Sequence, residues 1–298
     1  MMKRLFDWMV PPGAGDVLGM NRRNVEFVLT RNPRRHFAIA NDKLLAKKIL
    51  REAGVAVADT LTTFESFFDV GQIETRLEGL EEFAIKPAHG SGGRGILVIT
   101  EREGGRFKTA GGRWLEAEAL RRHIADIVYG VYSLDRGDVA IVEPRLVPHP
   151  FFAALFKDGL SDIRVIVIDD VAALCMVRVP TKASDGKANL HQGGLGLAVD
   201  LETGQIERAR WKGALITHHP DNGAPVVGLT VPCWGEIVSL AERASKAVPL
   251  DYLGVDLVID ARLGPLVLEI NIRPGLEIQN VTGVPLRRRL VEKARERS

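Results

Sequence analysis

Residues 254–275 constrain the fold more strongly than any other part of the sequence, because they have the pattern of two β-strands joined by a short turn. Aliphatic and β-branched residues flank the glycine-containing connection at residues 261–264. Side chains alternate across a strand, so Glu269 and Asn271 are expected on one face. The opposite face is expected to carry the aliphatic residues Leu268, Ile270 and Ile272. If the strands pair as a hairpin, Asp256 can lie opposite Glu269 on the polar face.

The polar face of this hairpin is a candidate site for a metal and phosphate. Asp256, Glu269 and Asn271 offer hard oxygen ligands. Mg²⁺ usually takes one or two such protein ligands and completes its shell with water and nucleotide phosphates. Arg273 follows on the same side of the strand, where its guanidinium can meet phosphate. The alternative is a solvated outer face of an antiparallel hairpin, and these residues alone leave both explanations open.

A second candidate site is the glycine-rich loop that follows a short apolar strand, predicted over residues 83–87. Lys86 lies at the end of this strand, and a second strand follows the loop. Glycines let the backbone approach a polyphosphate and point its amides at the oxygens, while Lys86 can reach the α and β phosphates. The loop residues expected to do this are Gly90, Ser91, Gly92, Gly93 and Gly95. The loop is neither a Walker motif nor a dinucleotide fingerprint, and a glycine-rich hairpin turn is the alternative.

Two further residues occupy positions suited to a nucleotide. Residues 41–42 form a good N-cap for a helix that Gly54 closes. Lys43 lies in the first turn of this helix, which is unfavourable for a lysine unless an anion is nearby. Glu143 ends the strand predicted over residues 139–143 and leads into a loop, a common place for a protein to meet the edge of adenine.

A β-rich block follows in the second half of the chain. Residues 162–168 and 171–178 predict an antiparallel hairpin, because an Asp-Asp turn separates two apolar runs. Arg164 shares a strand face with Ile166 and Ile168, so it is an inward-facing charge unless that face lines a cleft.

The segment from residue 180 to residue 196 is a candidate lid. It is long and polar, and it contains Asn189 and His191. Such a loop can close over a reactive phosphate, although an ordinary surface loop is the alternative.

The two ends of the chain are basic. Residues 13–40 carry five arginines among glycines and asparagines. They are expected either to bind an anion or to form a solvated, irregular arm, and both explanations stay open. Residues 285–295 predict a basic helix with a solvated surface.

Composition excludes several classes of protein. The formal net charge of +2 is too small to indicate binding to nucleic acid or to an anionic membrane. No run approaches the roughly 20 apolar residues of a membrane span. Cys175 and Cys233 are too few for a disulfide framework, and both are expected to be reduced core residues. We therefore expect a soluble, cytoplasmic protein with no nucleic-acid or membrane partner.

Taken together and in order, these segments resemble the ATP-grasp superfamily. The form Glu269-Ile270-Asn271 followed by Arg273, and the run from Asn189 to Gly194, look most like its glutamate-ligase branch, which includes the ribosomal-protein modification enzymes. The arginine-rich arm also looks like the sugar-transfer-associated group. The resemblance implies an α/β (α+β) fold in which two subdomains enclose ATP. The implied regions are an N-terminal arm (1–40), an ATP-grasp domain (41–285) with subdomains at about 83–143 and 144–285, and a C-terminal helix (286–298).

The resemblance also implies roles for residues that match the family pattern. ATP and two Mg²⁺ ions, with Mn²⁺ as an alternative metal, are the implied cofactors. The implied metal ligands are Asp256, Glu269 and Asn271. The implied nucleotide-binding residues are Lys43, Lys86, the loop Gly90, Ser91, Gly92, Gly93 and Gly95, and Glu143. The residues implied to act on the transferring phosphoryl group or from the lid are Arg164, Arg178, Arg273, Asn189 and His191.

The chemistry implied by the family joins a carboxylate to an amine through an acylphosphate. The carboxylate acceptor can be a small molecule, a peptide or a protein terminus, and glutamate is a typical amine. Relatives usually carry an α/β domain of roughly a hundred residues before the region that matches, and here only about 40 residues stand there, so the acceptor site must be built differently. A kinase-like phosphotransferase and a nucleotide-binding assembly protein without turnover remain alternatives. The oligomeric state stays open, with homo-oligomers common among relatives.

Overall fold

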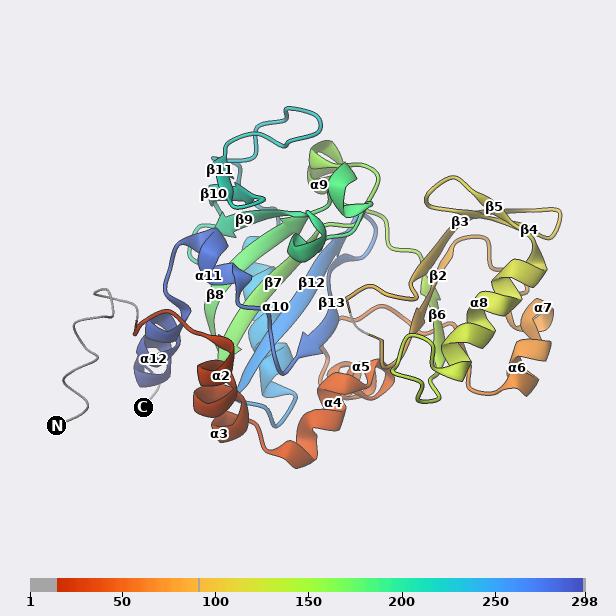
Figure 1. Ribbon diagram of the computed structural model, residues 1–298, viewed down its shortest axis with the longest axis horizontal. Coiled ribbons are helices and arrows are strands. Elements are labelled where there is room, and N and C mark those ends of the chain that lie inside the picture. The colour runs from red at the N-terminus through yellow and green to blue at the C-terminus, as the bar shows by residue number, and fades with distance from the viewer. Residues whose placement is uncertain (1–14, 91, 297–298) are drawn as a thin grey trace.

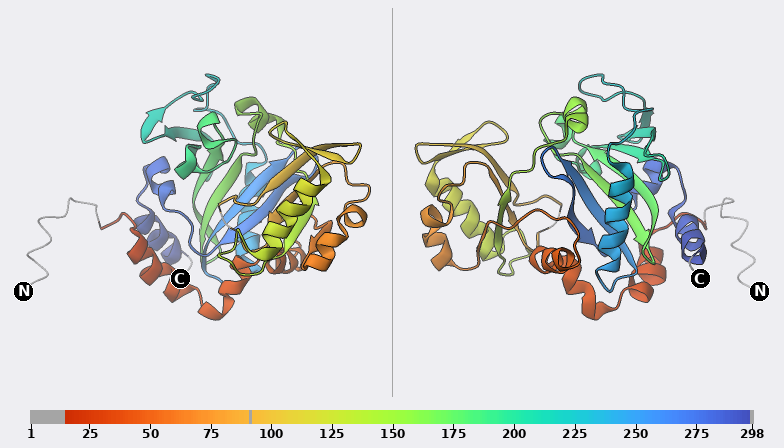
Figure 2. Two further views of the ribbon diagram at one scale, coloured as in Figure 1. Left: turned by 45° about the vertical axis from the view of Figure 1, so that its right-hand side comes forward. Right: turned by 180° about the vertical axis from the view of Figure 1, so that it is seen from behind.

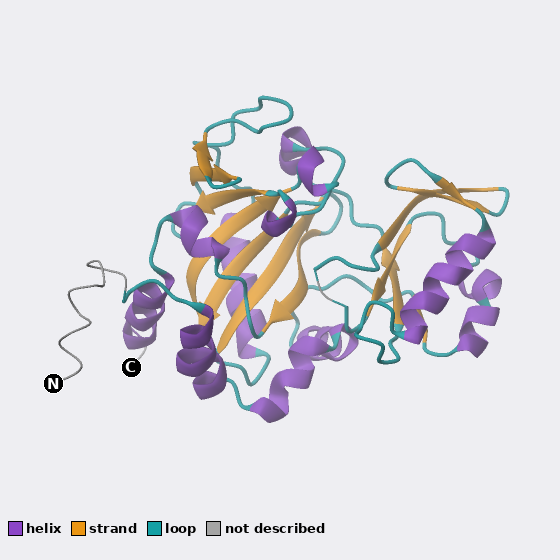
Figure 3. Cartoon of the chain, in the orientation of Figure 1, coloured by secondary structure: helices purple, strands orange, loops and turns teal. Residues whose placement is uncertain are grey.

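The computed structural model describes residues 15–90 and 92–296, and it has two lobes that lie side by side (Figure 1). Each lobe contains an antiparallel β-sheet with helices packed against it. The helix α5 (Lys43–Glu52) lies between the two lobes. Figure 3 shows the same arrangement by element type, with helices flanking both sheets.

The smaller lobe contains the glycine-rich loop and its flanking strands. Its sheet has the order β1 (Thr62–Phe64), β6 (Ala140–Pro144), β2 (Phe83–Pro87), β3 (Leu97–Glu103), β4 (Arg106–Thr109) and β5 (Trp114–Leu115). The helices α6 (Phe67–Gly71), α7 (Ile73–Arg76) and α8 (Ala117–Tyr129) pack against it. Leu120, Ile124 and Ile127 form one apolar stripe on α8 and are fully buried, because their spacing of three and four residues places them on one face of the helix.

The larger lobe contains the predicted hairpins. Its sheet has the order β11 (Ala214–Ile216), β10 (Ile206–Trp211), β9 (Leu195–Val199), β8 (Val171–Val179), β7 (Asp162–Ile168), β12 (Tyr252–Asp260) and β13 (Gly264–Asn271). Asp169 and Asp170 both have positive φ, at 48° and 66°, as a tight hairpin turn requires. The pairing of β12 with β13 places Asp256 directly opposite Glu269, which confirms the predicted register.

A β-bulge changes one detail of that hairpin. Asp256 pairs with Glu269, but the next residue, Leu257, pairs with Val267, so Leu268 has no partner. Val267 therefore lies in the core together with Ile270, whereas Leu268 is only half-buried. The expectation that Leu268 shares the core face is wrong, because an extra residue in one strand shifts the alternation of side chains.

The two faces of the larger sheet are covered differently. One face, with Val165, Leu253 and Val255, packs against α5 and α10 (Trp234–Lys246). Figure 2 shows α10 over this face when the molecule is seen from behind. The other face, with Ile166, Ile168 and Tyr252, packs against α11 (Glu277–Thr282), α12 (Leu286–Glu296) and the N-terminal segment. The short helix α9 (Pro150–Leu155) connects the lobes in the chain.

The expected irregular N-terminal arm is helical. It contains α2 (Met20–Arg23), a π-helical turn (Asn24–Val28), α3 (Leu29–Arg31), a 3₁₀ turn (Arg34–His36) and α4 (Phe37–Asn41). Leu18, Phe27 and Val28 are buried against the larger sheet. The side chain of Asn32 accepts a hydrogen bond from the Tyr252 amide at 3.0 Å and donates one to the Tyr252 carbonyl at 2.6 Å. The expectation of an irregular arm rested on the arginines of this segment and did not take account of its apolar residues, which pack against the sheet. Residues 1–14 lie outside the described part.

The C-terminal helix is also more than a solvated surface. Leu286 and Leu290 are fully buried, because their four-residue spacing places both on the face of α12 that packs on the sheet. This helix meets the N-terminal segment through an ion pair between Arg287 Nε and Glu26 Oε2 at 2.7 Å. Close by, the Leu18 amide donates a hydrogen bond to Gln279 Oε1 at 3.0 Å.

Two expectations that rested on composition have different outcomes. Cys175 is buried as expected, but Cys233 is exposed, since it precedes α10 rather than lying within a strand. Within residues 15–90 and 92–296, no helix has both the length and the apolar character needed to cross a membrane.

Candidate nucleotide and metal site

Two lysines share one buried carboxylate in the smaller lobe. Lys86 Nζ lies 2.7 Å from Glu143 Oε2, and Lys47 Nζ forms an ion pair with the other carboxylate oxygen. Strand pairing explains the first contact, because β2 and β6 are neighbours and place Ala84 opposite Glu143. Lys86 is two residues after Ala84, so its side chain lies on the same face of the sheet and can reach Glu143. Burial alone would raise the pKa of Glu143, but the two ammonium groups hold it below its ordinary value. The buried cluster therefore contains two ammonium groups and one carboxylate, so one positive charge is not compensated within it.

The sequence interpretation missed Lys47. It lies four residues after Lys43, so both lysines lie on the same side of α5, facing the smaller lobe. Its side chain is only 6% exposed. Burial lowers the pKa of Lys47, and Glu143 opposes that shift. The repeat of lysines at helical spacing was the available signal.

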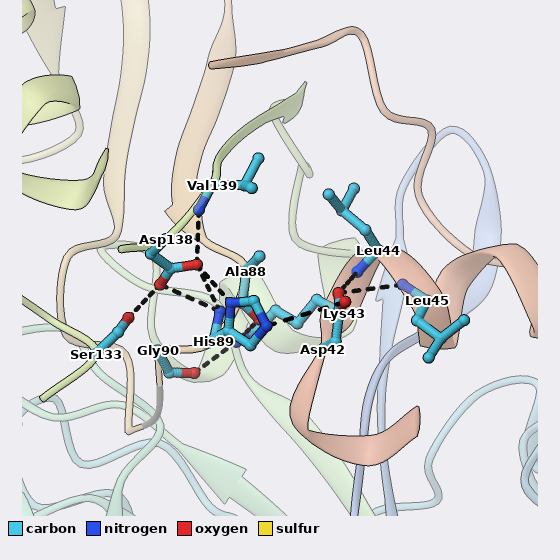
Figure 4. Close-up of polar contacts among 10 residues, drawn as sticks. All are labelled: Asp42, Lys43, Leu44, Leu45, Ala88, His89, Gly90, Ser133, Asp138 and Val139. Atoms are coloured by element: carbon cyan, nitrogen blue, oxygen red, sulfur yellow. Dashed lines mark hydrogen bonds and ion pairs between the residues drawn. The ribbon is translucent and has the colours of Figure 1, made fainter. Parts of the chain in front are cut away.

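Lys43 contacts the start of the glycine-rich loop. Its ammonium group donates hydrogen bonds to the carbonyls of Gly90 at 2.5 Å and Ala88 at 3.3 Å (Figure 4). Asp42 caps the helix, as predicted, by accepting from the Leu44 and Leu45 amides. Burial lowers the pKa of Lys43, while the charge of Glu269 raises it. The charges of the first-turn lysine and of Glu269, a predicted metal ligand, therefore influence each other.

The glycines of the loop have conformations that other residues rarely adopt. Gly92, Gly93 and Gly95 have φ values of +66°, +73° and +76°. At Gly90 a Cβ atom would lie 2.3 Å from the Pro87 ring, so the backbone passes too close for a side chain. Ser91 lies outside the described residues.

A hydrogen-bonded histidine, also missed from the sequence, anchors the base of this loop. His89 Nδ1 lies 2.7 Å from Asp138 Oδ1, and the Asp138 carboxylate also accepts from the backbone amides of His89 and Val139 (Figure 4). Burial raises the pKa of Asp138, but hydrogen bonds from Ser133 and His89 leave it below its ordinary value. These contacts hold the chain before the glycines to the strand that leads to Glu143.

Arginines surround Asp256 in the larger lobe. Arg164 donates to both Asp256 oxygens, at 2.7 and 2.5 Å, and Arg178 Nη2 lies 2.9 Å from Oδ2. Arg178 also forms a two-pronged pair with Asp162, with Nη2 to Oδ2 at 2.7 Å. Burial opposes the charge on Asp256, but the two guanidinium groups hold its pKa well below its ordinary value. Burial and the neighbouring Asp256 charge raise the pKa of Asp162, which the sequence interpretation did not include in the site.

The predicted metal ligands converge at this point. Asn271 Nδ2 lies 3.3 Å from both Asp256 Oδ2 and Glu269 Oε1. Among the residues that the structure describes, no group of three or more His, Cys, Asp or Glu side chains could hold a metal. A metal here would therefore need the amide oxygen of Asn271, and the amide would have to turn, because its nitrogen faces the two carboxylates. Two carboxylates and one amide fit Mg²⁺, which accepts few protein ligands, all of them oxygen. A metal here would compete with Arg164 and Arg178 for Asp256.

Within the described ranges, the side chains of the remaining predicted residues make no hydrogen bond or ion pair with Asp256, Glu269 or Asn271. Arg273 is exposed and stacks over the ring of Phe37, with 5.4 Å from Cζ to the ring centroid. Asn189 Oδ1 caps a 3₁₀ turn (Leu190–Gln192) by accepting from the amide of His191, which is exposed. No hydrogen bond or ion pair within the described ranges joins Asn189 or His191 to Asp256.

The predicted lid contains two 3₁₀ turns and is hydrogen-bonded to the larger sheet. A second 3₁₀ turn (Lys182–Ser184) has Thr181 as its N-cap. The Thr181 side chain accepts a hydrogen bond from the Ser184 amide, and the Ser184 side chain accepts one from the Thr181 amide. The Gly193 carbonyl accepts from Thr181 Oγ1 at 2.8 Å and from Trp211 Nε1 at 2.9 Å. These bonds attach the loop to β10 of the larger sheet.

Known proteins resemble nearly the whole chain. Residues 22–294 match the family model described as "Sugar-transfer associated ATP-grasp". A "Probable alpha-L-glutamate ligase" of Xanthomonas oryzae pv. oryzae is 25% identical over 293 residues, which cover 96% of this chain and 77% of that protein.

Solved structures share the fold at low identity. The VanG D-Ala:D-Ser ligase of Enterococcus faecalis is similar with a TM-score of 0.50 and 15% identity, over 86% of this chain and 62% of that one. The biotin carboxylase domain of the Hydrogenobacter thermophilus 2-oxoglutarate carboxylase has a TM-score of 0.51 and 17% identity, over 88% of this chain and 46% of that one. The predicted α+β ATP-grasp fold is confirmed, and the chain belongs to the sugar-transfer-associated ATP-grasp family.

Proposed function

We propose that this protein is an ATP-dependent ligase that joins a carboxylate to an amine. The observation that carries the proposal is the convergence of Asp256, Glu269 and Asn271 on one face of the larger sheet, where the charges of Glu269 and of Lys43, on α5 between the lobes, influence each other. The names of its relatives support the proposal, since they include probable alpha-L-glutamate ligases and a D-Ala:D-Ser ligase. The proposed amine is an amino acid, with glutamate as the first candidate.

The smaller lobe would hold the nucleotide. Lys43, Lys47 and Lys86 bring three ammonium groups to the start of the glycine-rich loop and to Glu143. Phosphate oxygens would replace carbonyl and carboxylate partners of these lysines, and the backbone near Glu143 would meet adenine. The biotin carboxylase domain with the similar fold was solved with magnesium ADP and bicarbonate, which supports ATP and Mg²⁺ as cofactors.

The larger lobe would hold the metal and the reacting groups. Mg²⁺ bound by Asp256, Glu269 and Asn271 would supply charge neutralisation for the phosphates. Arg164 and Arg178 are fixed by two-pronged contacts, so they can stabilise negative charge on a transferring phosphoryl group without reorganising. Arg273, Asn189 and His191 are proposed to contribute once substrate is bound.

The proposed reaction has two steps. An oxygen of the acceptor carboxylate attacks the γ-phosphorus of ATP, the bond to the β-phosphate oxygen breaks, and ADP leaves. The amine nitrogen then attacks the acyl carbon of the acylphosphate, the C–O bond to phosphate breaks, and an amide, a proton and inorganic phosphate result. The protein contributes mainly positioning and charge stabilisation.

The first test measures ADP release with ATP and Mg²⁺ across a panel of carboxylates, with and without amino acids. ADP formation that requires both a carboxylate and an amine is the expected result. A phosphorylated product without amide would replace the proposal with a kinase-like phosphotransferase. ATP binding without turnover on any pair would favour an assembly protein or a macromolecular acceptor.

A matched pair of variants links this activity to the proposed metal ligands. Glu269→Gln is expected to abolish ADP release while the protein stays folded, because an amide is a poor substitute for a carboxylate at a Mg²⁺ site. Glu207→Gln changes an exposed glutamate on β10 of the same sheet and is expected to keep full activity. Full activity in Glu269→Gln would overturn the metal assignment.

A further inference from the structure

The two ends of the molecule's longest axis carry charges of opposite sign (Figure 1). The segment of residues 65–82, which contains α6 and α7 at the outer end of the smaller lobe, has six acidic residues and one basic residue. The elements at the outer end of the larger lobe, α2, the π-helical turn, α3 and α12, have eight basic residues and three acidic ones. The formal net charge of +2 for the whole chain therefore conceals a separation of charge along its length.

Exposed aromatic side chains accompany the acidic residues. Phe67 and Phe68, the first two residues of α6, are 60% and 75% exposed, while Val70 is the residue of this short helix that is buried. Glu65 and Glu78 are exposed, and neither forms an ion pair with another residue that the structure describes. We call the exposed side chains of residues 65–82 the acidic face.

The opposite end of the molecule combines basic and aliphatic side chains. Met20, Val25 and Leu29 are 70%, 61% and 44% exposed on the helical segment that begins with α2. Arg288 and Arg295 are exposed on α12. The ion pair that joins α12 to this segment makes the two one continuous surface. We call the exposed side chains of α2, the π-helical turn, α3 and α12 the basic face.

The two faces are chemically complementary. Aromatic residues, methionine and arginine are enriched at protein interfaces, and charges of opposite sign across an interface attract and orient the partners. The acidic face has aromatic residues and negative charge, whereas the basic face has methionine, aliphatic residues and arginines. A nucleic acid or an anionic membrane would match the basic face alone. A second copy of the chain matches both faces, because each face offers what the other lacks.

We propose that copies of this chain associate head to tail, with the acidic face of one copy on the basic face of the next. In this contact Phe67 and Phe68 pack against Met20, Val25 and Leu29, and the charged side chains around them pair at the rim. Each contact leaves one acidic face and one basic face free, because the two faces differ and lie at opposite ends of the molecule (Figure 2). The assembly therefore grows as an open chain or closes as a ring.

The test measures self-association of the full chain by sedimentation velocity. At about 0.05 M salt and protein concentrations up to about 100 μM, the wild type is expected to form species that grow with concentration. Raising the salt to about 0.5 M is expected to weaken the association about tenfold, because salt screens the charges of the two faces. A wild type that stays monomeric at the lower salt would overturn the proposal. Association that is equally strong at both salt concentrations would overturn the assignment to the charged faces.

Two variants and their mixture test the geometry of the contact. Phe68→Arg blocks the acidic face, and Met20→Glu blocks the basic face. Both residues are exposed, so the variants are expected to fold normally and to be monomeric where the wild type associates. Leu263→Glu, which changes an exposed residue of the turn between β12 and β13, is expected to associate like the wild type.

An equimolar mixture of the two face variants is expected to form a dimer that does not grow further. One intact basic face and one intact acidic face remain in the mixture, and they can make a single contact. A symmetric contact between identical faces would instead leave one of the variants able to associate by itself, and that result would overturn the head-to-tail arrangement. A mixture that stays monomeric while the wild type associates would also overturn it.

Discussion

The two lobes each contain a buried carboxylate contacted by two cations, but they use different cations. Glu143 in the smaller lobe is contacted by Lys47 and Lys86, whereas Asp256 in the larger lobe is contacted by Arg164 and Arg178. Lysine is a compact charge on a flexible stem, while arginine binds carboxylates through a rigid fork.

This difference suggests how each cluster would respond to a ligand. Each lysine contacts Glu143 through a single ammonium group, so it can exchange the Glu143 carboxylate for a phosphate oxygen of a bound ligand. Arg178 is also held by Asp162, so a ligand meets the arginines already in place. The smaller lobe is suited to exchanging partners, and the larger lobe to fixed charge stabilisation.

The largest expected effect comes from breaking the lysine cluster. Glu143→Gln leaves two buried ammonium groups without a carboxylate, so we expect a loss of about 3–5 kcal/mol in the free energy of unfolding. Urea denaturation checks this value. Glu82→Gln removes a surface partner of Arg145 and is expected to cost less than about 1 kcal/mol. Equal losses in the two variants would contradict a buried, charge-dependent cluster.

Breaking the arginine cluster is expected to affect stability less and turnover more. Asp256→Asn leaves Arg178 paired with Asp162 and removes the carboxylate partner of Arg164 alone, so we expect a loss of roughly 1.5–3 kcal/mol in stability. ADP release is expected to disappear, since the variant also removes a proposed metal ligand. Asp162→Asn, measured in the same assays, is expected to retain part of the activity. Activity in Asp256→Asn equal to wild type would remove Asp256 from the site.

Acid is expected to weaken the lysine cluster, whereas in the arginine cluster the raised pKa of Asp162 opposes the effect of the lowered pKa of Asp256. Glu143 and Asp256 have pKa values below their ordinary ones in the folded protein, so below about pH 4 the unfolded chain binds more protons than the native one. The stability they contribute is therefore present above that pH and lost as the pH falls. Urea midpoints between pH 3 and pH 7 test this, and Glu143→Gln is expected to show a shallower decline. If the urea midpoints of Glu143→Gln and of the wild type fall in parallel as the pH decreases, Glu143 is not a source of the loss of stability in acid.

The smallest expected effect concerns the predicted lid. Asn189→Ala removes the cap of a 3₁₀ turn and is expected to cost about 1 kcal/mol. Asn189→Asp keeps an oxygen that can accept from the His191 amide. If the aspartate variant retains ADP release and the alanine variant loses it, Asn189 acts as a cap; loss in both would support contact with the substrate.

The sequence predicted the parts of the site that depend on strand alternation and local pattern. The pairing of Asp256 with Glu269 followed from two strands and a short turn, and Lys86 followed from its place at a strand end. The helix cap at Asp42 was predicted for the same reason, because capping depends only on neighbouring residues.

Contacts between distant elements could not be predicted in this way. Lys47 reaches Glu143 across 96 positions, and the sheet order that brings them together is not visible in either segment. The bulge at Leu268 depends on how β12 and β13 accommodate each other, and the burial of Leu18 and Phe27 depends on a sheet formed much later in the chain. Because both ends of the chain are rich in charged residues, they were expected to be solvated, and the packing of their apolar residues against the larger sheet was not predicted.

The contacts between the two ends of the chain have a consequence for biosynthesis. One face of the larger sheet is covered by Leu18 and Phe27 from the beginning of the chain and by Leu286 and Leu290 from its end. The Leu18 amide and Gln279 are 261 positions apart. Contacts of such separation form late, because a long loop must close first. Residue 290 therefore has to emerge from the ribosome before this face of the sheet can be covered completely. Until then, the apolar side chains of this face are exposed and available to chaperones.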